Sequence, residues 1–175
     1  MTQRQRFEDL YQAHAGAVLS YACRRTSRAD ADDVVAEVFL VAWRRLEEVP
    51  GNPRIWLLGV ARRVLANQRR GHGRRLALTE RLAQVSPTSH QAMIAERPQA
   101  RIAQALEALS ESDRELLLLL AWEGLSNAEA ARVLGVRPQA LRVRLHRARR
   151  RFARALDAAH SAASSADNPT ALEAL

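Results

Sequence analysis

Arginine is the residue whose type and spacing point most clearly to chemistry in this sequence. Nine arginines fall between Arg132 and Arg154, and no acidic residue stands between Glu129 and Asp157. A second stretch, residues 54–75, contains seven arginines and no acid. Guanidinium groups hold phosphates through forked pairs of N–H donors, and clustered positive charge gains affinity for a polyanion by releasing counterions. Both stretches therefore predict binding to a polyanion or to an acidic surface.

The composition is that of a folded helical protein. The chain has 175 residues, 47% of them hydrophobic and 26% charged, which is enough for one ordinary domain or two small ones. Only 5% are aromatic, whereas Ala, Leu, Arg and Glu, which favour helices, recur throughout. The net charge is +8, and all 27 basic residues are arginine. We expect an all-α fold.

Other classes of protein find little support. A single cysteine, Cys23, excludes an internal disulfide and favours a reducing compartment. There is no apolar signal core and no run near the roughly 18 apolar residues that a membrane span needs, so we expect a cytoplasmic protein without membrane insertion. The five histidines lack metal-binding spacing, and no Gly-rich phosphate loop is present. We expect no metal, no cofactor and no enzymatic activity.

The first half of the chain predicts three helices. Apolar residues recur at three- and four-residue steps from Phe7 onward, as on one face of a helix. Three aspartates within residues 30–33 favour the N-terminus of a second helix, whose apolar stripe is expected to include Trp43 and to end near Leu46. After a Pro- and Gly-rich turn, a third helix is expected over residues 53–70.

The second half predicts a linker and another helical module. Residues 74–97 have weak periodicity and a Ser-Pro break, which indicates a flexible linker. A helix is expected from Pro98 to about Leu109. After a cap at Ser110 or Ser112, an apolar helix should run from residue 113 to about 123, and Trp122 is expected to pack against it and close the core. The expected divisions of the chain are 5–73, 74–97 (linker), 98–157 and 158–175 (disordered tail).

The second arginine-rich stretch predicts two helices around a glycine turn. Ser126 is a candidate N-cap, Glu129 completes a capping box, and Gly135 is expected to end the first helix. The next helix should begin at Pro138 and bury one face, formed by Leu141, Leu145, Ala148, Phe152 and Ala155. The opposite face is basic. This is the helix-turn-helix arrangement, whose second helix enters the major groove of DNA.

Three stretches resemble parts of one known family. LSNAEAARVLGVRPQALRVRLHRARRRF is similar to the C-terminal promoter-reading module of sigma-70 family RNA polymerase sigma factors, in the extracytoplasmic-function (ECF) group. DADDVVAEVFLVAWRRL and NPRIWLLGVARRVLANQRRG are similar to the N-terminal module of the same group. The resemblance covers about residues 5–157. It implies a transcription initiation factor that binds core RNA polymerase, directs it to promoters, reads the −35 element as duplex and captures the −10 element as melted strand.

The resemblance also implies three groups of contact residues and one further partner. Docking on core polymerase falls to the second helix, at Asp32, Asp33, Glu37, Val41 and Arg44. Capture of the −10 strand falls to the third helix, at Trp56, Arg62, Arg63, Asn67 and Arg70, although Trp56 is equally compatible with a place in the core. Reading of the −35 duplex falls to Arg137, Gln139, Arg142, Arg144 and Arg147. An anti-sigma factor that holds the protein inactive is the further expected partner.

Two departures from the family pattern concern base recognition. Arg63 stands where many members have asparagine, so it is suited to hold a phosphate where asparagine would read a base edge. The last helix has Gln139, Ala140 and Val143 near positions where hydroxyl side chains are frequent in the family. The loss of those donors shifts the expected readout toward arginine, DNA shape and a methyl contact from Val143.

Two alternative functions fit part of the sequence. A stand-alone helix-turn-helix transcriptional regulator would bind DNA without polymerase, but it gives no reason for the acid-led second helix or the first arginine-rich stretch. An RNA-binding or purely structural helical protein would tolerate the loss of Gly135 and show no preference among DNA sequences.

Overall fold

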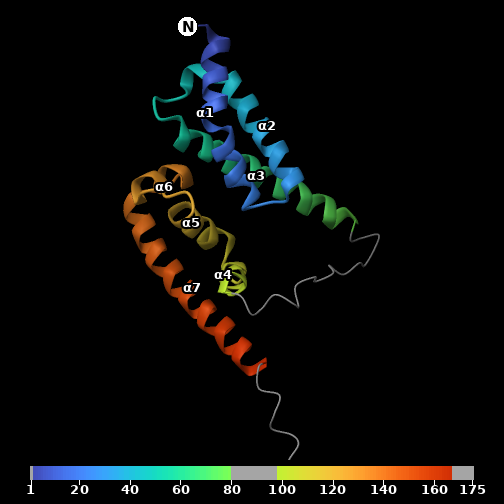
Figure 1. The fold of residues 1–175 in the computed structure, drawn as a ribbon, viewed down its shortest axis with the longest axis vertical. Coiled ribbons are helices and arrows are strands. Elements are labelled where there is room, and N and C mark those ends of the chain that lie inside the picture. Colours follow the sequence, from blue (N-terminus) through green and yellow to red (C-terminus); the bar gives the residue numbers. More distant parts are fainter. Residues whose placement is uncertain (1, 80–97, 167–175) are drawn as a thin grey trace, which may run out of the picture. The chain divides into compact units, whose positions relative to one another are not determined.

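The computed structural model describes residues 2–79 and 98–166, and these ranges are helical without any strand (Figure 1). The chain forms two compact units, the first containing helices α1 to α3 and the second helices α4, α5 and α7. The expected all-α fold with two small helical domains is confirmed.

The first unit packs three helices against one another in every pairing. They are α1 (Gln3–Cys23), α2 (Arg28–Arg44) and α3 (Pro53–Thr79), with a short 3-10 helix, η1 (Leu46–Glu48), between α2 and α3. Their shared core contains the fully buried side chains of Val18, Tyr21, Val34, Val38, Leu57 and Leu58. This core fixes the outer faces of α2 and α3 in a defined orientation.

Local capping determines where α2 begins, next to the aspartates that predicted a helix N-terminus. Ser27 is the N-cap, and its hydroxyl accepts from the Asp30 backbone N–H at 3.2 Å while donating to Asp30 Oδ2 at 2.6 Å. Asp30 is therefore committed to the helix terminus, where a carboxylate also meets the positive end of the helix dipole.

Aromatic side chains close one edge of the first unit. Phe7 meets Trp43 edge to face with ring centroids 5.1 Å apart, and Tyr11 meets Phe39 at 4.7 Å. Trp43 is nevertheless 40% exposed, so it borders the apolar stripe of α2 and is not part of its core.

Helix α3 is longer than the sequence predicted. It continues through Gly71 and Gly73 to Thr79, and the Arg, Leu and Ala residues after the glycines are good helix formers. The first six residues of the expected linker are thus helical, and residues 80–97 of that linker lie outside the described residues. Helix α2 in turn ends at Arg44, and Leu46 is buried in η1 instead.

The described chain after residue 97 contains α4 (Pro98–Glu107), α5 (Glu111–Ala121), α6 (Asn127–Leu134) and α7 (Pro138–Ala166), of which α4, α5 and α7 belong to the second unit. Ser110 is the N-cap of α5 and accepts from the Asp113 N–H. The Arg114 guanidinium donates to the carbonyls of Leu106 and Glu107, both at 2.8 Å, and so satisfies the C-terminus of α4. Helices α4 and α5 both pack on α7.

Two expectations for this unit were wrong. Trp122 does not close the core: it follows the last residue of α5, where the chain turns at Gly124, and it is 50% exposed while Leu125 is buried instead. The tail expected from residue 158 begins as helix, because α7 runs to Ala166. Ala159 is buried, and Arg101 of α4 donates to His160 Nδ1 at 2.8 Å, so tertiary contacts hold this extension.

Candidate nucleic-acid interface

The turn between α6 and α7 is built by local hydrogen bonds. Ser126 and Glu129 form the expected capping box: the Glu129 N–H donates to Ser126 Oγ at 3.3 Å, and the Ser126 N–H donates to Glu129 Oε2 at 2.9 Å. At the other end, the N–H groups of Gly135 and Val136 donate to carbonyls of the last turn of α6, and Gly135 has φ +67°. This is the Schellman ending, for which glycine is the preferred residue. The predicted helix-turn-helix is confirmed.

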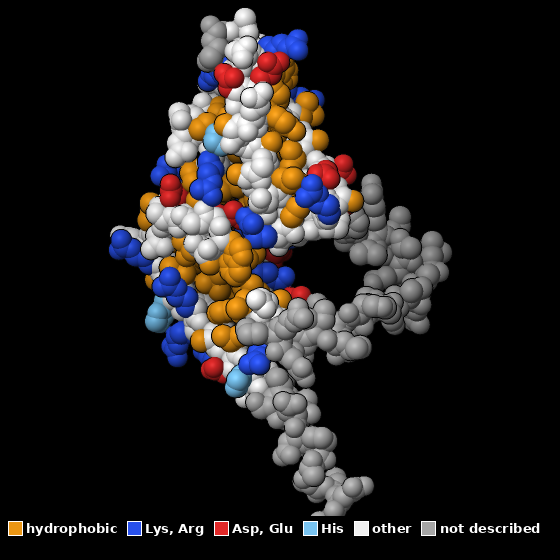
Figure 2. Space-filling view, viewed as in Figure 1, with side chains coloured by type: hydrophobic (Ala, Val, Ile, Leu, Met, Phe, Trp, Pro, Cys, Tyr) orange, Lys and Arg blue, Asp and Glu red, His pale blue; other side chains and the backbone are white. Residues whose placement is uncertain are grey.

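Helix α7 has one buried side and one exposed basic side. Leu141, Leu145 and Ala148, here called the buried seam, are at most 6% exposed, while Phe152 and Ala155 are half-buried. The opposite face is exposed and carries Gln139, Val143, His146, Arg147 and Arg150. Basic side chains line the edge that α7 forms in Figure 2, with histidine between them. The helix can therefore present guanidinium groups to a nucleic acid while its seam remains packed.

The residues expected to read the −35 duplex differ in how accessible they are. Arg137, Gln139, Arg142 and Arg147 are exposed, whereas Arg144 is half-buried. Arg144 is therefore the member of the group with the least side chain free to reach a base or phosphate.

One arginine of the stretch from Arg132 to Arg154 stabilises the fold. Arg151 Nη1 donates to Asp113 Oδ2 at 2.6 Å, and this ion pair joins α7 to the first turn of α5. The Asp113 side chain is only 7% exposed. A carboxylate buried to that degree requires a charged partner, so Arg151 is not available in the way that Arg147 is.

Helix α3 carries most of the residues expected to capture the −10 strand on one face. At about 100° per residue, Trp56, Arg63, Asn67 and Arg70 fall within one side of the helix, and Arg62 lies on its flank. Arg63, Asn67 and Arg70 are exposed, whereas Trp56 and Arg62 are half-buried. The Arg70 guanidinium donates to Asn67 Oδ1, which links the two side chains.

Helix α2 presents an acidic strip with an apolar residue that sequence reasoning missed. Asp33, Glu37 and Arg44 recur at helical spacing and are exposed, and Leu40 between them is 47% exposed. The signal was present, because Leu40 lies off the buried Val34–Val38–Ala42 side of the helix.

The other two residues of α2 that were expected to dock on core polymerase flank this strip. Asp32 is exposed and pairs with Arg28 at 3.7 Å, and Val41 is half-buried.

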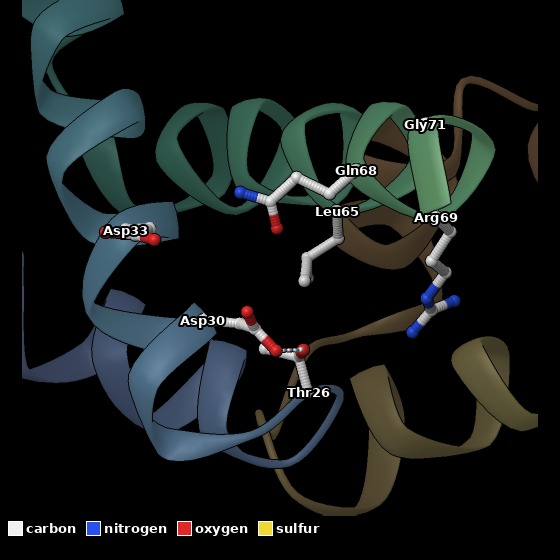
Figure 3. Close-up of a pocket in the computed structure, with 7 residues that line it drawn as sticks. All are labelled: Thr26, Asp30, Asp33, Leu65, Gln68, Arg69 and Gly71. Carbon is white, nitrogen blue, oxygen red and sulfur yellow. Dashed lines mark hydrogen bonds between the residues drawn. The ribbon is translucent and has the colours of Figure 1, made fainter. Parts of the chain in front are cut away.

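An open hollow lies between the start of α2 and the second half of α3 (Figure 3). It is lined by Thr26, Asp30, Asp33, Leu65, Gln68, Arg69 and Gly71. Thr26 donates to Asp30 in the close-up, at 3.2 Å, and Arg69 donates to the Arg25 carbonyl at 3.1 Å. Among the residues expected to dock on polymerase or to capture the −10 strand, Asp33 lines this hollow.

Burial, and secondly the charge of Arg54, lower the pKa of His14, which disfavours its charged form. Over residues 2–79 and 98–166, the structure shows neither a cluster of His, Cys, Asp or Glu suited to a metal ion nor a helix long and apolar enough to cross a membrane.

Fold and surface together define a class: a two-unit helical DNA-binding protein whose second unit ends in a helix-turn-helix. The family model for "Sigma-70 region 2" matches residues 10–75, and that for "Sigma-70, region 4" matches residues 99–152. The chain belongs to the sigma-70 family of RNA polymerase sigma factors, in its ECF group. It is a transcription initiation factor that directs core polymerase to promoters, and it is not an enzyme.

Named relatives span most of the chain. The RNA polymerase sigma factor CnrH of Cupriavidus metallidurans is 32% identical over an alignment of 161 residues that covers 83% of this chain and 84% of CnrH. The ECF RNA polymerase sigma factor SigL of Mycobacterium tuberculosis is 32% identical over an alignment of 143 residues that covers 78% of this chain and 81% of SigL.

Solved structures give the same result. The structure of CnrH in complex with the cytosolic domain of CnrY matches with a TM-score of 0.62 at 31% identity, over 90% of each chain. The sigma factor RpoE in complex with the anti-sigma factor NepR from Bartonella quintana matches with a TM-score of 0.67 at 25% identity, over 86% of this chain and 96% of that one.

Proposed function

We propose that this factor divides promoter recognition among three faces of its two units. Residues 5–73 form the module that docks on polymerase and captures the −10 strand, residues 74–97 join the modules, and residues 98–157 read the −35 element. The observation that carries this proposal is the exposed arginine face of α7 opposite its buried seam. A helix with that arrangement after a helix-turn-helix turn suits the major groove.

Reading of the −35 duplex is assigned to the start and outer face of α7. Arg137, Gln139, Arg142 and Arg147 are exposed there, and guanidinium and amide groups suit the acceptor patterns of guanine and adenine in the major groove. Arg144 completes the group from the flank, as a phosphate contact.

Capture of the −10 strand is assigned to one face of α3. Single strands are held by cations along the backbone and by flat side chains on which bases stack. Arg63 and Arg70 supply exposed cations, Asn67 supplies an amide between them, and Trp56 lies on the same side of the helix with its ring partly accessible. Arg62 contributes charge from the flank.

Docking on core polymerase is assigned to the acidic strip of α2. Asp33 and Glu37 would meet basic partners, and the exposed Leu40 between them and Arg44 adds an apolar contact at the centre of the strip. Asp32 and Val41 border it.

Two further assignments rest on the relatives. CnrH was solved with the cytosolic domain of CnrY, and RpoE with the anti-sigma factor NepR. An anti-sigma factor is therefore the proposed negative regulator of this chain as well. The proposed place of action of this sigma factor is the cytoplasm, where core polymerase and promoter DNA are found.

Transcription from fragmented high-G+C bacterial DNA, by core polymerase freed of its own sigma factor, tests the proposal. The protein should produce discrete new 5′ ends that share two upstream elements, and the same reaction without it should not. If the free protein binds DNA specifically but no new transcription start appears, the result would instead favour a stand-alone regulator.

A further inference from the structure

Val143 is a large apolar side chain at the centre of a polar face. At about 100° per residue it lies almost directly opposite the buried seam of α7, and it is 52% exposed. Gln139 and Arg147, one turn before and one turn after it on the same face, are exposed as well. Val143 thus lies near the middle of the outward side of α7, in its second turn.

Packing within the protein does not explain this valine. A half-exposed apolar residue is ordinary by itself, but β-branched side chains are poorer helix formers than alanine or arginine, and the outer face of α7 is otherwise polar or basic around it. The position of Val143 is unusual, because this side chain without a hydrogen-bond donor or acceptor lies where a recognition helix contacts base edges.

The major groove offers one good partner for such a side chain. Adenine, guanine and cytosine present donors and acceptors at their edges, and covering these with an apolar group would leave them unpaired. Thymine presents a C5 methyl group beside its O4 acceptor, and this methyl group is an apolar surface that the other bases lack. We propose that Val143 is a specificity-determining residue that selects thymine at one position of the −35 element through contact with this methyl group.

This inference rests on the proposed reading of the −35 element by α7, and its test is made on holoenzyme assembled from core polymerase and the full chain. Each thymine of the mapped −35 element, on either strand, is replaced in turn by deoxyuridine, which pairs identically but lacks the methyl group. One replacement should weaken promoter binding about fourfold, the factor corresponding to about 0.8 kcal/mol for one buried methyl-sized group.

The matched protein variants decide whether Val143 is the residue that reads the methyl group. Val143→Ala should weaken binding to the thymine promoter by a similar factor and should no longer respond to deoxyuridine at that position. Arg150→Ala, on the same exposed face, should weaken binding to both promoters and keep the full response. Circular dichroism checks that the variants remain helical, as expected for exposed positions.

Three results would overturn the inference: a −35 element without thymine, no thymine sensitive to deoxyuridine, or the same sensitivity in Val143→Ala as in the wild-type chain. In each of these cases the holoenzyme still selects a −35 element, so the proposed function stands. A failure of the proposed function is a different result, in which the holoenzyme selects no upstream element at all.

Discussion

Arg147 and Arg151 stand four residues apart on α7, but their surroundings give them different tasks. Arg147 is exposed on the outer face, whereas Arg151 is held by the buried carboxylate of Asp113. Charge counting along the sequence treats the two alike. Their replacement by alanine should nevertheless affect different measurements.

Arg147→Ala should weaken promoter binding and reduce its dependence on salt. One phosphate contact contributes about 0.9 to the slope of log K against log [salt] on B-DNA, so the slope should fall by about that amount. Binding of holoenzyme to a promoter duplex over a series of salt concentrations measures it. If the slope stays unchanged, Arg147 does not hold a phosphate.

Arg151→Ala should destabilise the second unit by about 1–3 kcal/mol, because it leaves a buried carboxylate without its charged partner. Amide hydrogen exchange of the full chain should show faster exchange in α5 and α7. Arg150→Ala is the matched control, since an exposed arginine should change stability by less than about 0.5 kcal/mol. Equal protection in both variants would show that the Asp113 pair contributes little.

At the scale of elements, the turn between α6 and α7 fixes how the reading helix leaves its partner. Gly135 has φ +67°, and a Cβ at this position would have no heavy atom within 4 Å apart from those of the two adjacent residues. A substitution there is therefore opposed by backbone conformation alone. The structure gives no steric reason against a side chain.

Gly135→Ala should cost about 1 kcal/mol, because a left-handed conformation is unfavourable for residues with a Cβ. Gly135→Asn should cost less, since asparagine tolerates that region better. Chemical unfolding of the full chain measures both variants, and −35 duplex binding should follow the same order. A neutral alanine variant would mean that the turn adopts another conformation at little cost.

At the scale of the whole molecule, polymerase docking and duplex reading belong to different units, so they should be separable. Asp33 is exposed on α2 in the first unit, and the outer face of α7 lies in the second. A charge reversal on α2 has no structural reason to disturb the helix-turn-helix.

Asp33→Arg should abolish association with core polymerase and leave helix content unchanged, because it reverses charge at an exposed position. Co-purification with core polymerase measures association. Asp9→Arg, which makes the same change on the exposed side of α1, should associate normally. Normal association of Asp33→Arg would place the docking face elsewhere.

The sequence by itself determined the features that depend on near neighbours. The Ser126–Glu129 capping box, the turn at Gly135 and the buried seam of α7 arise from residues three or four positions apart, and all are present as predicted. The assignment to a family also followed from such local stretches, because each module keeps its own pattern of caps and apolar spacing.

The tertiary structure decided the features that depend on distant partners. In the sequence, Arg151 is one of nine clustered arginines. Its structural role follows from its contact with Asp113, which lies 38 positions away. The helical extension of α7 depends on contacts such as that of His160 with Arg101, 59 positions away. Exposure likewise distinguishes Leu40 and Trp122 from the buried leucines, because burial is set by what packs from other helices and not by hydrophobicity alone.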